Sequence, residues 1–152
     1  MRDDLTDPTV EGLVSAKSAE EGRSPRHPYG ILVVEADPDL QWRMARVLTI
    51  EGNRVVGTSS GDGALALIDQ WDVDLVLVDE DLPGMDGLEV VRRIAERQPG
   101  VPVILITDED GQDVQVAARL AGATSCVRKP IAMQTVRDLL RHVQPDLERA
   151  AE

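Results

Sequence analysis

The chain has 152 residues, of which 42% are hydrophobic, and this is enough for one domain with a single core. The formal net charge of -12 argues against direct binding to nucleic acid or to an anionic membrane surface. One cysteine, Cys126, excludes an internal disulfide and suits a reducing cytoplasm, and no apolar run approaches the length of a membrane span.

The first 28 residues are polar and charged, and they have no sustained apolar period of the helical or the strand kind. We therefore predict a disordered extension over 1–28. From residue 29 onward apolar runs recur, which predicts a folded domain over 29–144. Pro145 then ends the last helical pattern, and a polar tail over 145–152 is expected.

Five short apolar runs, rich in Val and Ile, are the strand candidates. They read ILVV (31–34), RVVG (54–57), LVLV (75–78), VPVILI (101–106) and SCVR (125–128). Most of them do not alternate with polar residues, which is typical of parallel strands that are covered on both faces.

A helical stretch follows each run. The first is predicted to begin at Asp37 and Pro38, an N-cap acid followed by a proline in the first turn, and to end at Gly52. Four more are predicted around 64–71, 88–95, 113–121 and 132–143. This alternation predicts an α/β fold, in which right-handed crossovers give a parallel sheet with helices on both faces.

Acidic residues follow three of the strand candidates, in the segments EADPD (35–39), DEDLPGMD (79–86) and TDED (107–110). Sites in parallel sheets form at the carboxyl ends of the strands, near the switch point of the topology. These segments therefore predict a small anionic pocket that suits a hard divalent cation.

Five features, in this order, resemble the receiver domain of bacterial response regulators. They are ILVVEADPDL, DLVLVDEDLPGMDGLEV, VPVILIT, the AGA before the fifth strand and the RKP after it, and they cover about residues 30–143. The resemblance implies a flavodoxin-like five-stranded parallel sheet with the strand order 2-1-3-4-5. It also implies a two-component signalling domain that accepts a phosphoryl group, rather than a catalytic enzyme.

The resemblance implies a role for individual residues. Asp79 would be the phosphoacceptor, and its carboxylate would attack the phosphohistidine of a kinase or phosphotransfer protein. Glu35, Asp79 and the backbone carbonyl of Asp81 would bind Mg²⁺, which neutralises charge during the transfer. Thr107 would bind a phosphoryl oxygen and signal the modified state, and Lys129 would pair with the phosphoryl group.

Three positions depart from the family pattern. Ala36 stands where the family has a second metal-binding acid, and Asp37 beside it is expected to cap a helix instead, so Mg²⁺ binding should be weak. Asp108 follows Thr107 where a small residue is usual, and its charge should crowd and repel a phosphoryl group. Cys126 replaces the usual aromatic switch of the fifth strand.

Two other classes of protein remain open. The three departures favour a pseudo-receiver, an interaction module that never takes phosphate. The D-x-D pair of Asp79 and Asp81 also occurs in haloacid-dehalogenase-like phosphohydrolases. That family has Thr or Val at the position of Pro83, however, and its motif lies on the first strand rather than the third.

The implied partners are a histidine kinase or phosphotransfer protein and a downstream protein target, in the cytoplasm. We expect a receiver with no attached output domain in this chain. Thr124 and Ser125 stand where paired receiver dimers carry acids, so a monomer or a weak dimer is expected.

Overall fold

The computed structural model describes residues 29–132 together with 134, 135, 137, 138 and 141. The predicted extension and tail lie outside these residues. Of the predicted last helix, the described residues 134, 135, 137, 138 and 141 are helical. Of the apolar residues expected to face the core from this helix, Ala132 is exposed, whereas Val136, Leu139, Leu140 and Val143 lie outside the described residues.

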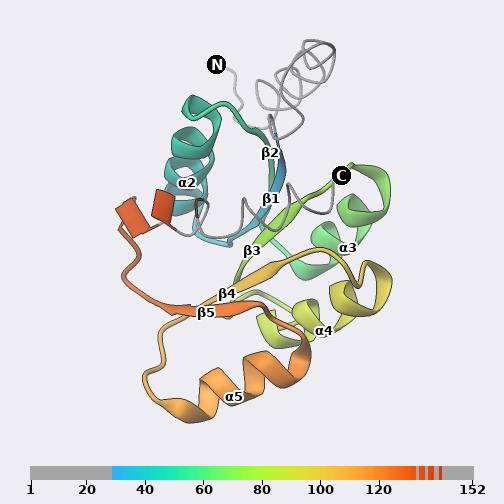
Figure 1. Ribbon diagram of the computed structural model, residues 1–152, viewed down its shortest axis with the longest axis vertical. Helices are drawn as coiled ribbons and strands as arrows, with labels where there is room; N and C mark the ends of the chain where they lie inside the picture. Colours follow the sequence, from blue (N-terminus) through green and yellow to red (C-terminus); the bar gives the residue numbers. More distant parts are fainter. Residues whose placement is uncertain (1–28, 133, 136, 139–140, 142–152) are drawn as a thin grey trace.

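Strands and helices alternate along the described chain, as the apolar runs predict (Figure 1). The strands are β1 (Gly30–Val34), β2 (Arg54–Thr58), β3 (Leu75–Asp79), β4 (Val103–Thr107) and β5 (Ser125–Arg128). The helices between them are α2 (Pro38–Ile50), α3 (Gly61–Gln70), α4 (Gly87–Arg97) and α5 (Gln112–Ala121). All strand pairs are parallel, in the order β2-β1-β3-β4-β5, which confirms the predicted fold.

Two boundaries differ from the sequence prediction. β4 begins at Val103, two residues into the apolar run, because Pro102 has no N–H for the ladder; its carbonyl accepts from Val76 N at 3.0 Å. Trp71 does not belong to α3 but is its C-cap, in an extended conformation with φ -110° and ψ 155°.

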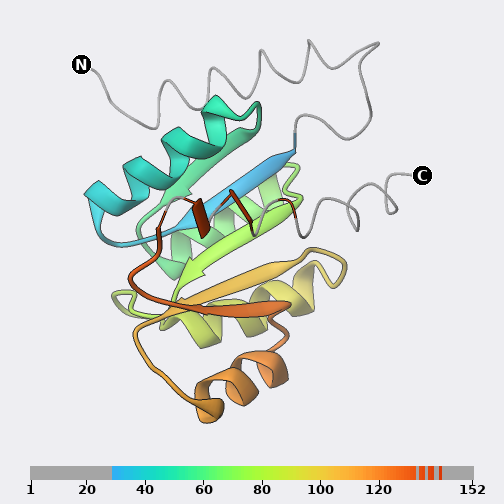
Figure 2. The ribbon, with the colours of Figure 1, turned by 60° about the vertical axis from the view of Figure 1, so that its left-hand side comes forward.

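The sheet is buried on both faces, and each strand divides its side chains between them. Helices lie on both sides of the sheet (Figure 2). Toward α2 it presents Ile31, Val33, Leu75, Leu77, Ile104 and Ile106, which pack with Met44, Ala45 and Leu48. Toward α3, α4 and α5 it presents Leu32, Val34, Val76, Val78, Val103 and Leu105. We call these the α2 face and the α3–α5 face. Burial on both sides explains why the strand runs are continuously apolar, each such side chain contributing about 1.5–3 kcal/mol.

Two helix ends are set by capping residues next to them in the sequence. Asp37 caps α2, and its Oδ1 accepts from Asp39 N at 3.0 Å and from Leu40 N at 3.4 Å, as predicted. Gly122 ends α5 with φ 113°, where a Cβ would meet the Ala95 Cβ at 2.7 Å. The cap at Asp37 starts α2 directly after the carboxyl end of β1, whereas Gly122 lies before the amino end of β5.

Among the described residues, no helix combines the length and hydropathy that crossing a membrane requires. Trp42 lies on the outer side of α2 with 43% of its surface exposed, and the Arg46 guanidinium stands 5.1 Å from the ring centroid. This is a cation–π contact on the surface.

Candidate functional site

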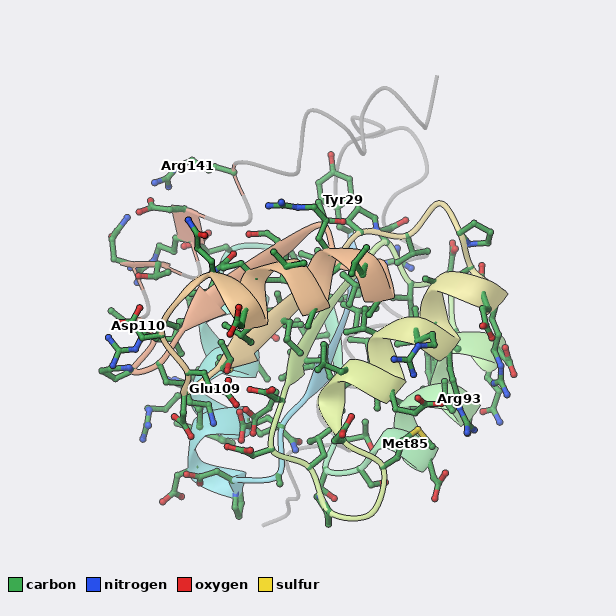
Figure 3. The ribbon with its side chains drawn as sticks, turned by 90° about the horizontal axis from the view of Figure 1, so that it is seen from below. Tyr29, Met85, Arg93, Glu109, Asp110 and Arg141 are labelled. Atoms are coloured by element: carbon green, nitrogen blue, oxygen red, sulfur yellow. The ribbon has the colours of Figure 1, made fainter. Side chains whose placement is uncertain are left out.

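The carboxyl ends of β1 and β3 place two acids side by side. Val34 pairs with Val78 in the ladder, so the next residues, Glu35 and Asp79, are neighbours. Only 2% of the surface of each is exposed, although both are carboxylates. The loop after β4, with Glu109 and Asp110, lies at the same end of the sheet (Figure 3). The predicted gathering of acids at this edge is therefore present.

Side-chain alternation divides the residues of this edge between the two faces of the sheet. Continued by one residue, the alternation of β1 and β3 places Glu35 and Asp79 on the α2 face. The same alternation places Glu80 and Thr107 on the α3–α5 face. Cys126, which packs against the α3–α5 core, shares that second side.

Lys129 brings the positive charge of the site. Its Nζ lies 2.7 Å from Asp79 Oδ1, with the two side chains 20% and 3% exposed. Its backbone N donates to Thr107 O at 2.7 Å, and the Lys129-Pro130 peptide bond is cis. Burial by itself lowers the pKa of Lys129, but its bond to Asp79 and the charges of Glu35 and Asp108 raise that pKa above the ordinary value. Lys129 is therefore a permanent cation at neutral pH.

Glu35 is a buried carboxyl with an incomplete set of partners. Its Oε2 accepts from Asp37 N at 3.0 Å, and its backbone carbonyl accepts from Gln41 Nε2 at 2.8 Å. Its Oε1 is buried and has no hydrogen-bond partner among the described residues. Burial raises the pKa of Glu35 to about 7; the Asp37 N–H opposes this rise and the charge of Asp79 adds to it.

The missing acid at Ala36 is not replaced by its neighbour. Ala36 is half-buried, and the carboxylate of Asp37 is occupied as the cap of α2. The β1 side of the site therefore has one carboxylate, Glu35, as the sequence predicted.

Asp81 and Asp108 lie close together across the loops that follow β3 and β4. Both are exposed, and the hydrogen bond between their carboxyl groups raises the pKa of Asp81, as do a slight loss of hydration and the charge of Asp79. The charge of Asp108 also acts on Lys129. Asp108 is thus near the predicted phosphoryl position, but in a solvent-exposed place where water screens its charge.

Glu80 is the site residue that the sequence analysis missed. The Thr107 hydroxyl donates to Glu80 Oε1, and Thr107 Oγ1 accepts from Glu109 N at 3.0 Å. Asp79 pairs with Ile106 in the ladder, so the next residues, Glu80 and Thr107, stand opposite each other. The signal in the sequence was the acid directly after Asp79, but only the register shows which residue it reaches.

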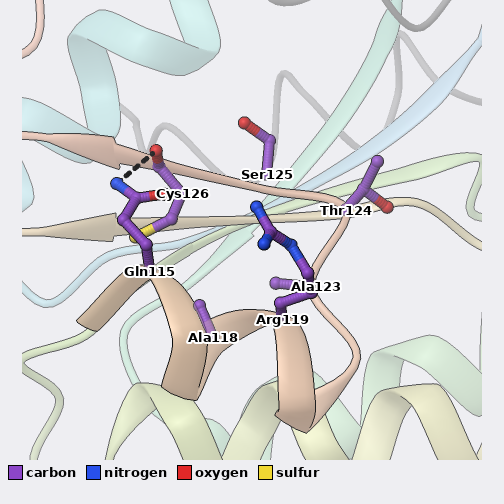
Figure 4. Close-up of a pocket in the computed structure, with 7 residues that line it drawn as sticks. All are labelled: Gln115, Ala118, Arg119, Ala123, Thr124, Ser125 and Cys126. Carbon is purple, nitrogen blue, oxygen red and sulfur yellow. Dashed lines mark hydrogen bonds between the residues drawn. The ribbon is translucent and has the colours of Figure 1, made fainter. Parts of the chain in front are cut away.

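Cys126 lies half-buried on β5. Burial raises the pKa of its thiol, and the charge of Glu80 adds to this, so the thiolate is disfavoured at neutral pH. Its carbonyl accepts from Gln115 Nε2 at 3.4 Å. The side of β5 that faces α5 borders a hollow (Figure 4), which is lined by Gln115, Ala118, Arg119, Ala123, Thr124, Ser125 and Cys126.

The donor set fits a divalent cation that keeps much of its water. Among the described residues, no group of three or more acid, His or Cys side chains forms a ready metal centre. Two buried carboxylate oxygens, Glu35 Oε1 and Asp79 Oδ1, nevertheless have no hydrogen-bond partner within this part of the chain, and the second forms an ion pair with Lys129. Hard oxygen donors of this kind, with several retained waters, suit Mg²⁺.

The hydrolase alternative does not agree with this arrangement. Asp79 ends the third strand rather than the first, and it forms an ion pair with Lys129. Asp81, the second acid of that motif, is exposed in the following loop.

Comparisons with known proteins agree with this geometry. The chain is 32% identical over 114 residues to the probable transcriptional regulatory protein TcrX of Mycobacterium tuberculosis, covering 75% of this chain and 49% of that protein. It is 34% identical over 122 residues to the transcriptional regulatory protein GlrR of Escherichia coli, covering 78% of this chain and 28% of that protein. The chain thus spans about half, or less, of the length of these relatives.

Solved structures show the same fold. A CheY-like receiver domain protein from Methanospirillum hungatei superposes with a TM-score of 0.76 at 24% identity, covering 81% of this chain and 98% of that one. A receiver domain protein from Clostridium thermocellum superposes with a TM-score of 0.72 at 25% identity, covering 78% and 95%. The family model of the response regulator receiver domain matches residues 31–141, and the chain therefore belongs to the receiver domains of two-component response regulators.

Proposed function

We propose that this receiver accepts a phosphoryl group on Asp79 from a histidine kinase or phosphotransfer protein in the cytoplasm, and relays the signal by binding a downstream protein. The observation that carries the proposal is the ion pair of 2.7 Å between Lys129 Nζ and Asp79 Oδ1 at a nearly dry strand end. A buried carboxylate held by one lysine is a nucleophile with a cation already in place for the incoming anion.

The chemistry is a transfer between two covalent partners. An oxygen of Asp79 attacks the phosphorus of the donor phosphohistidine, the new O–P bond forms as the N–P bond breaks, and the imidazole leaves with the electron pair. Because carboxylate and phosphoryl group are both anionic, the transfer depends on positioning and charge neutralisation. Lys129, which is 20% exposed, can follow the phosphoryl oxygens while it stays beside Asp79.

A divalent cation would be held by Glu35, Asp79 and the carbonyl of Asp81. Bound Mg²⁺ would neutralise charge on the phosphoryl oxygens. Glu35 has to be ionised to serve as a ligand, and with its pKa raised to about 7 it holds a proton in much of the population near neutral pH. Together with Ala36, this supports weak, pH-dependent binding of Mg²⁺.

The direct test is phosphoryl incorporation from acetyl phosphate with Mg²⁺, read by intact mass. Wild type should gain the mass of one phosphoryl group, and Asp79→Asn should gain none. Asp110→Asn is the matched control, because Asp110 is an exposed acid of the same edge whose only recorded partner in the described chain is Arg128 at 3.7 Å. Incorporation that survives in Asp79→Asn would refute the assignment.

A second candidate, the pseudo-receiver, is supported by two observations. Ala36 leaves one acid on the β1 side, and the Thr107 hydroxyl is already bonded to Glu80. The double variant Ala36→Asp with Asp108→Ala restores the family pattern at two of the three departures. If this variant takes no phosphoryl group, and Asp79→Asn leaves partner binding unchanged, the pseudo-receiver is the correct function.

A further inference from the structure

The side chain of Thr107 has a partner that the proposed function does not use. Thr107 is fully buried, its hydroxyl donates to Glu80 Oε1, and its oxygen accepts from Glu109 N at 3.0 Å. A threonine hydroxyl has a single hydrogen and can donate to one strong acceptor at a time. A phosphoryl oxygen on Asp79 and the carboxylate of Glu80 would therefore compete for the same proton.

The backbone around Glu80 is held firmly in place. Its N donates to Ile106 O at 2.7 Å, and its carbonyl accepts from Gly87 N at 2.9 Å. A Cβ on Gly87 would stand 2.4 Å from Asp79 O and 2.6 Å from Glu80 Cα, so the loop fits against this residue only because position 87 is glycine. Release of Thr107 would therefore come from rotation of the half-buried Glu80 side chain, with its backbone unmoved.

On the next strand, the side of the sheet that carries Glu80 and Thr107 has a small residue. Cys126 stands on the same face of the sheet, one strand further along, and it is a small side chain next to the hollow of α5 and β5. The charge of Glu80 also raises the pKa of the Cys126 thiol.

From this geometry, we propose that Glu80 is a positioning residue that holds the Thr107 hydroxyl in the unmodified receiver and sets the threshold for its switch. The inference rests on the proposed phosphorylation of Asp79. Formation of the modified state requires the hydroxyl to leave a charged acceptor. The apparent affinity for a phosphoryl group is reduced by the fraction of molecules in which Glu80 holds Thr107.

The experiment is a double-mutant cycle with beryllofluoride and Mg²⁺, a mimic of the phosphoryl group, followed by calorimetry. Glu80→Ala should tighten the apparent beryllofluoride affinity by about tenfold, the scale of one hydrogen bond to a charged acceptor. Glu80→Gln should fall between wild type and Glu80→Ala, because its amide oxygen still accepts from the hydroxyl. In a Thr107→Val background, both Glu80 substitutions should change the affinity by less than about twofold.

Asp110→Asn is the charge control, since it removes one exposed acid from the same edge without touching Thr107; it should leave affinity within about twofold of wild type. Equal gains from Glu80→Gln and Glu80→Ala that persist with Thr107→Val would overturn the inference and reduce Glu80 to a repulsive charge. An unchanged affinity in Glu80→Ala would overturn it as well. If no variant binds beryllofluoride and wild type takes no phosphoryl group, the proposed function and this inference both fall.

Discussion

One edge of the sheet carries two acidic side-chain groups whose carboxylates have different kinds of partner. On the α2 face, Glu35 and Asp79 are two buried acids that share one cation, Lys129. On the α3–α5 face, Glu80 has no lysine or arginine among its recorded partners in the described chain and instead accepts a hydrogen bond from Thr107. The first group has excess negative charge at low exposure. In the second group, the hydroxyl hydrogen of Thr107 is already donated to Glu80.

The two groups therefore differ in the kind of ligand that each can bind. Buried like charges are costly unless a cation compensates them, so the first group favours binding of a metal or a proton. A hydroxyl already bonded to a carboxylate is instead a competitor for any new acceptor. Substitutions on the α2 face should therefore change pH-dependent stability and metal affinity, whereas substitutions on the α3–α5 face should change the affinity for a phosphoryl mimic.

The largest expected effect is the pH dependence of stability that Glu35 imposes. Its pKa is about 7 in the folded chain against an ordinary 4.5, so the folded state binds the proton more tightly. Without Mg²⁺, the free energy of unfolding should be highest below pH 4.5 with respect to this group. It should then fall as pH rises toward 7, by up to about 3 kcal/mol.

Urea unfolding at a series of pH values checks this expectation. Glu35→Gln should remove the downward slope, because no proton is then exchanged at position 35. Glu96→Gln, at an exposed position of α4, should retain it. A slope that is the same in wild type and in Glu35→Gln would show that another group is responsible.

The next largest effect is on metal affinity at the α2 face. Ala36→Asp adds the missing charge and oxygen ligand, and it should tighten Mg²⁺ by roughly 1–3 kcal/mol, the scale of one charged interaction. Ala36→Asn is the matched control, because it has nearly the same shape without the charge. Magnesium titration followed by NMR measures both. Equal affinities for wild type and Ala36→Asp would mean that the cation binds elsewhere.

A smaller effect is expected from Asp108. The structure places this acid in solvent beside Asp81, where a like charge at about 4 Å costs about 1 kcal/mol. Asp108→Ala should therefore raise the extent of phosphorylation by roughly fivefold at low ionic strength, with a smaller gain at high salt. Phosphoryl incorporation at two salt concentrations tests this. An increase that is independent of salt would point to steric crowding as the cause.

The smallest effect is expected far from both groups. Arg137 Nε pairs with Glu51 Oε2 at 2.8 Å, with the side chains 38% and 33% exposed. Arg137→Ala should change the free energy of unfolding by less than about 0.5 kcal/mol, because surface ion pairs are weak. It should also leave the sedimentation coefficient of a monomer unchanged. A wild-type dimer that this substitution dissociates would contradict the expectation of a monomer or weak dimer.

Much of the fold was predictable because its signals are local. The apolar runs, the cap at Asp37 and the stop at Gly122 each depend on residues within one or two turns of each other. Asp79 and Thr107 could be assigned to strand ends for the same reason, since each follows an uninterrupted apolar run.

The sequence by itself therefore determined the order of the elements, the two-faced burial of the strands and the set of acids at their ends. Only the tertiary structure decided which partners those acids contact. The pairing of Glu80 with Thr107 spans 27 residues and depends on the register of β3 against β4. The raised pKa of Glu35 likewise depends on Asp79 and on burial. Register, desolvation and charge coupling act between segments far apart in the chain, and no local pattern encodes the distances that set them.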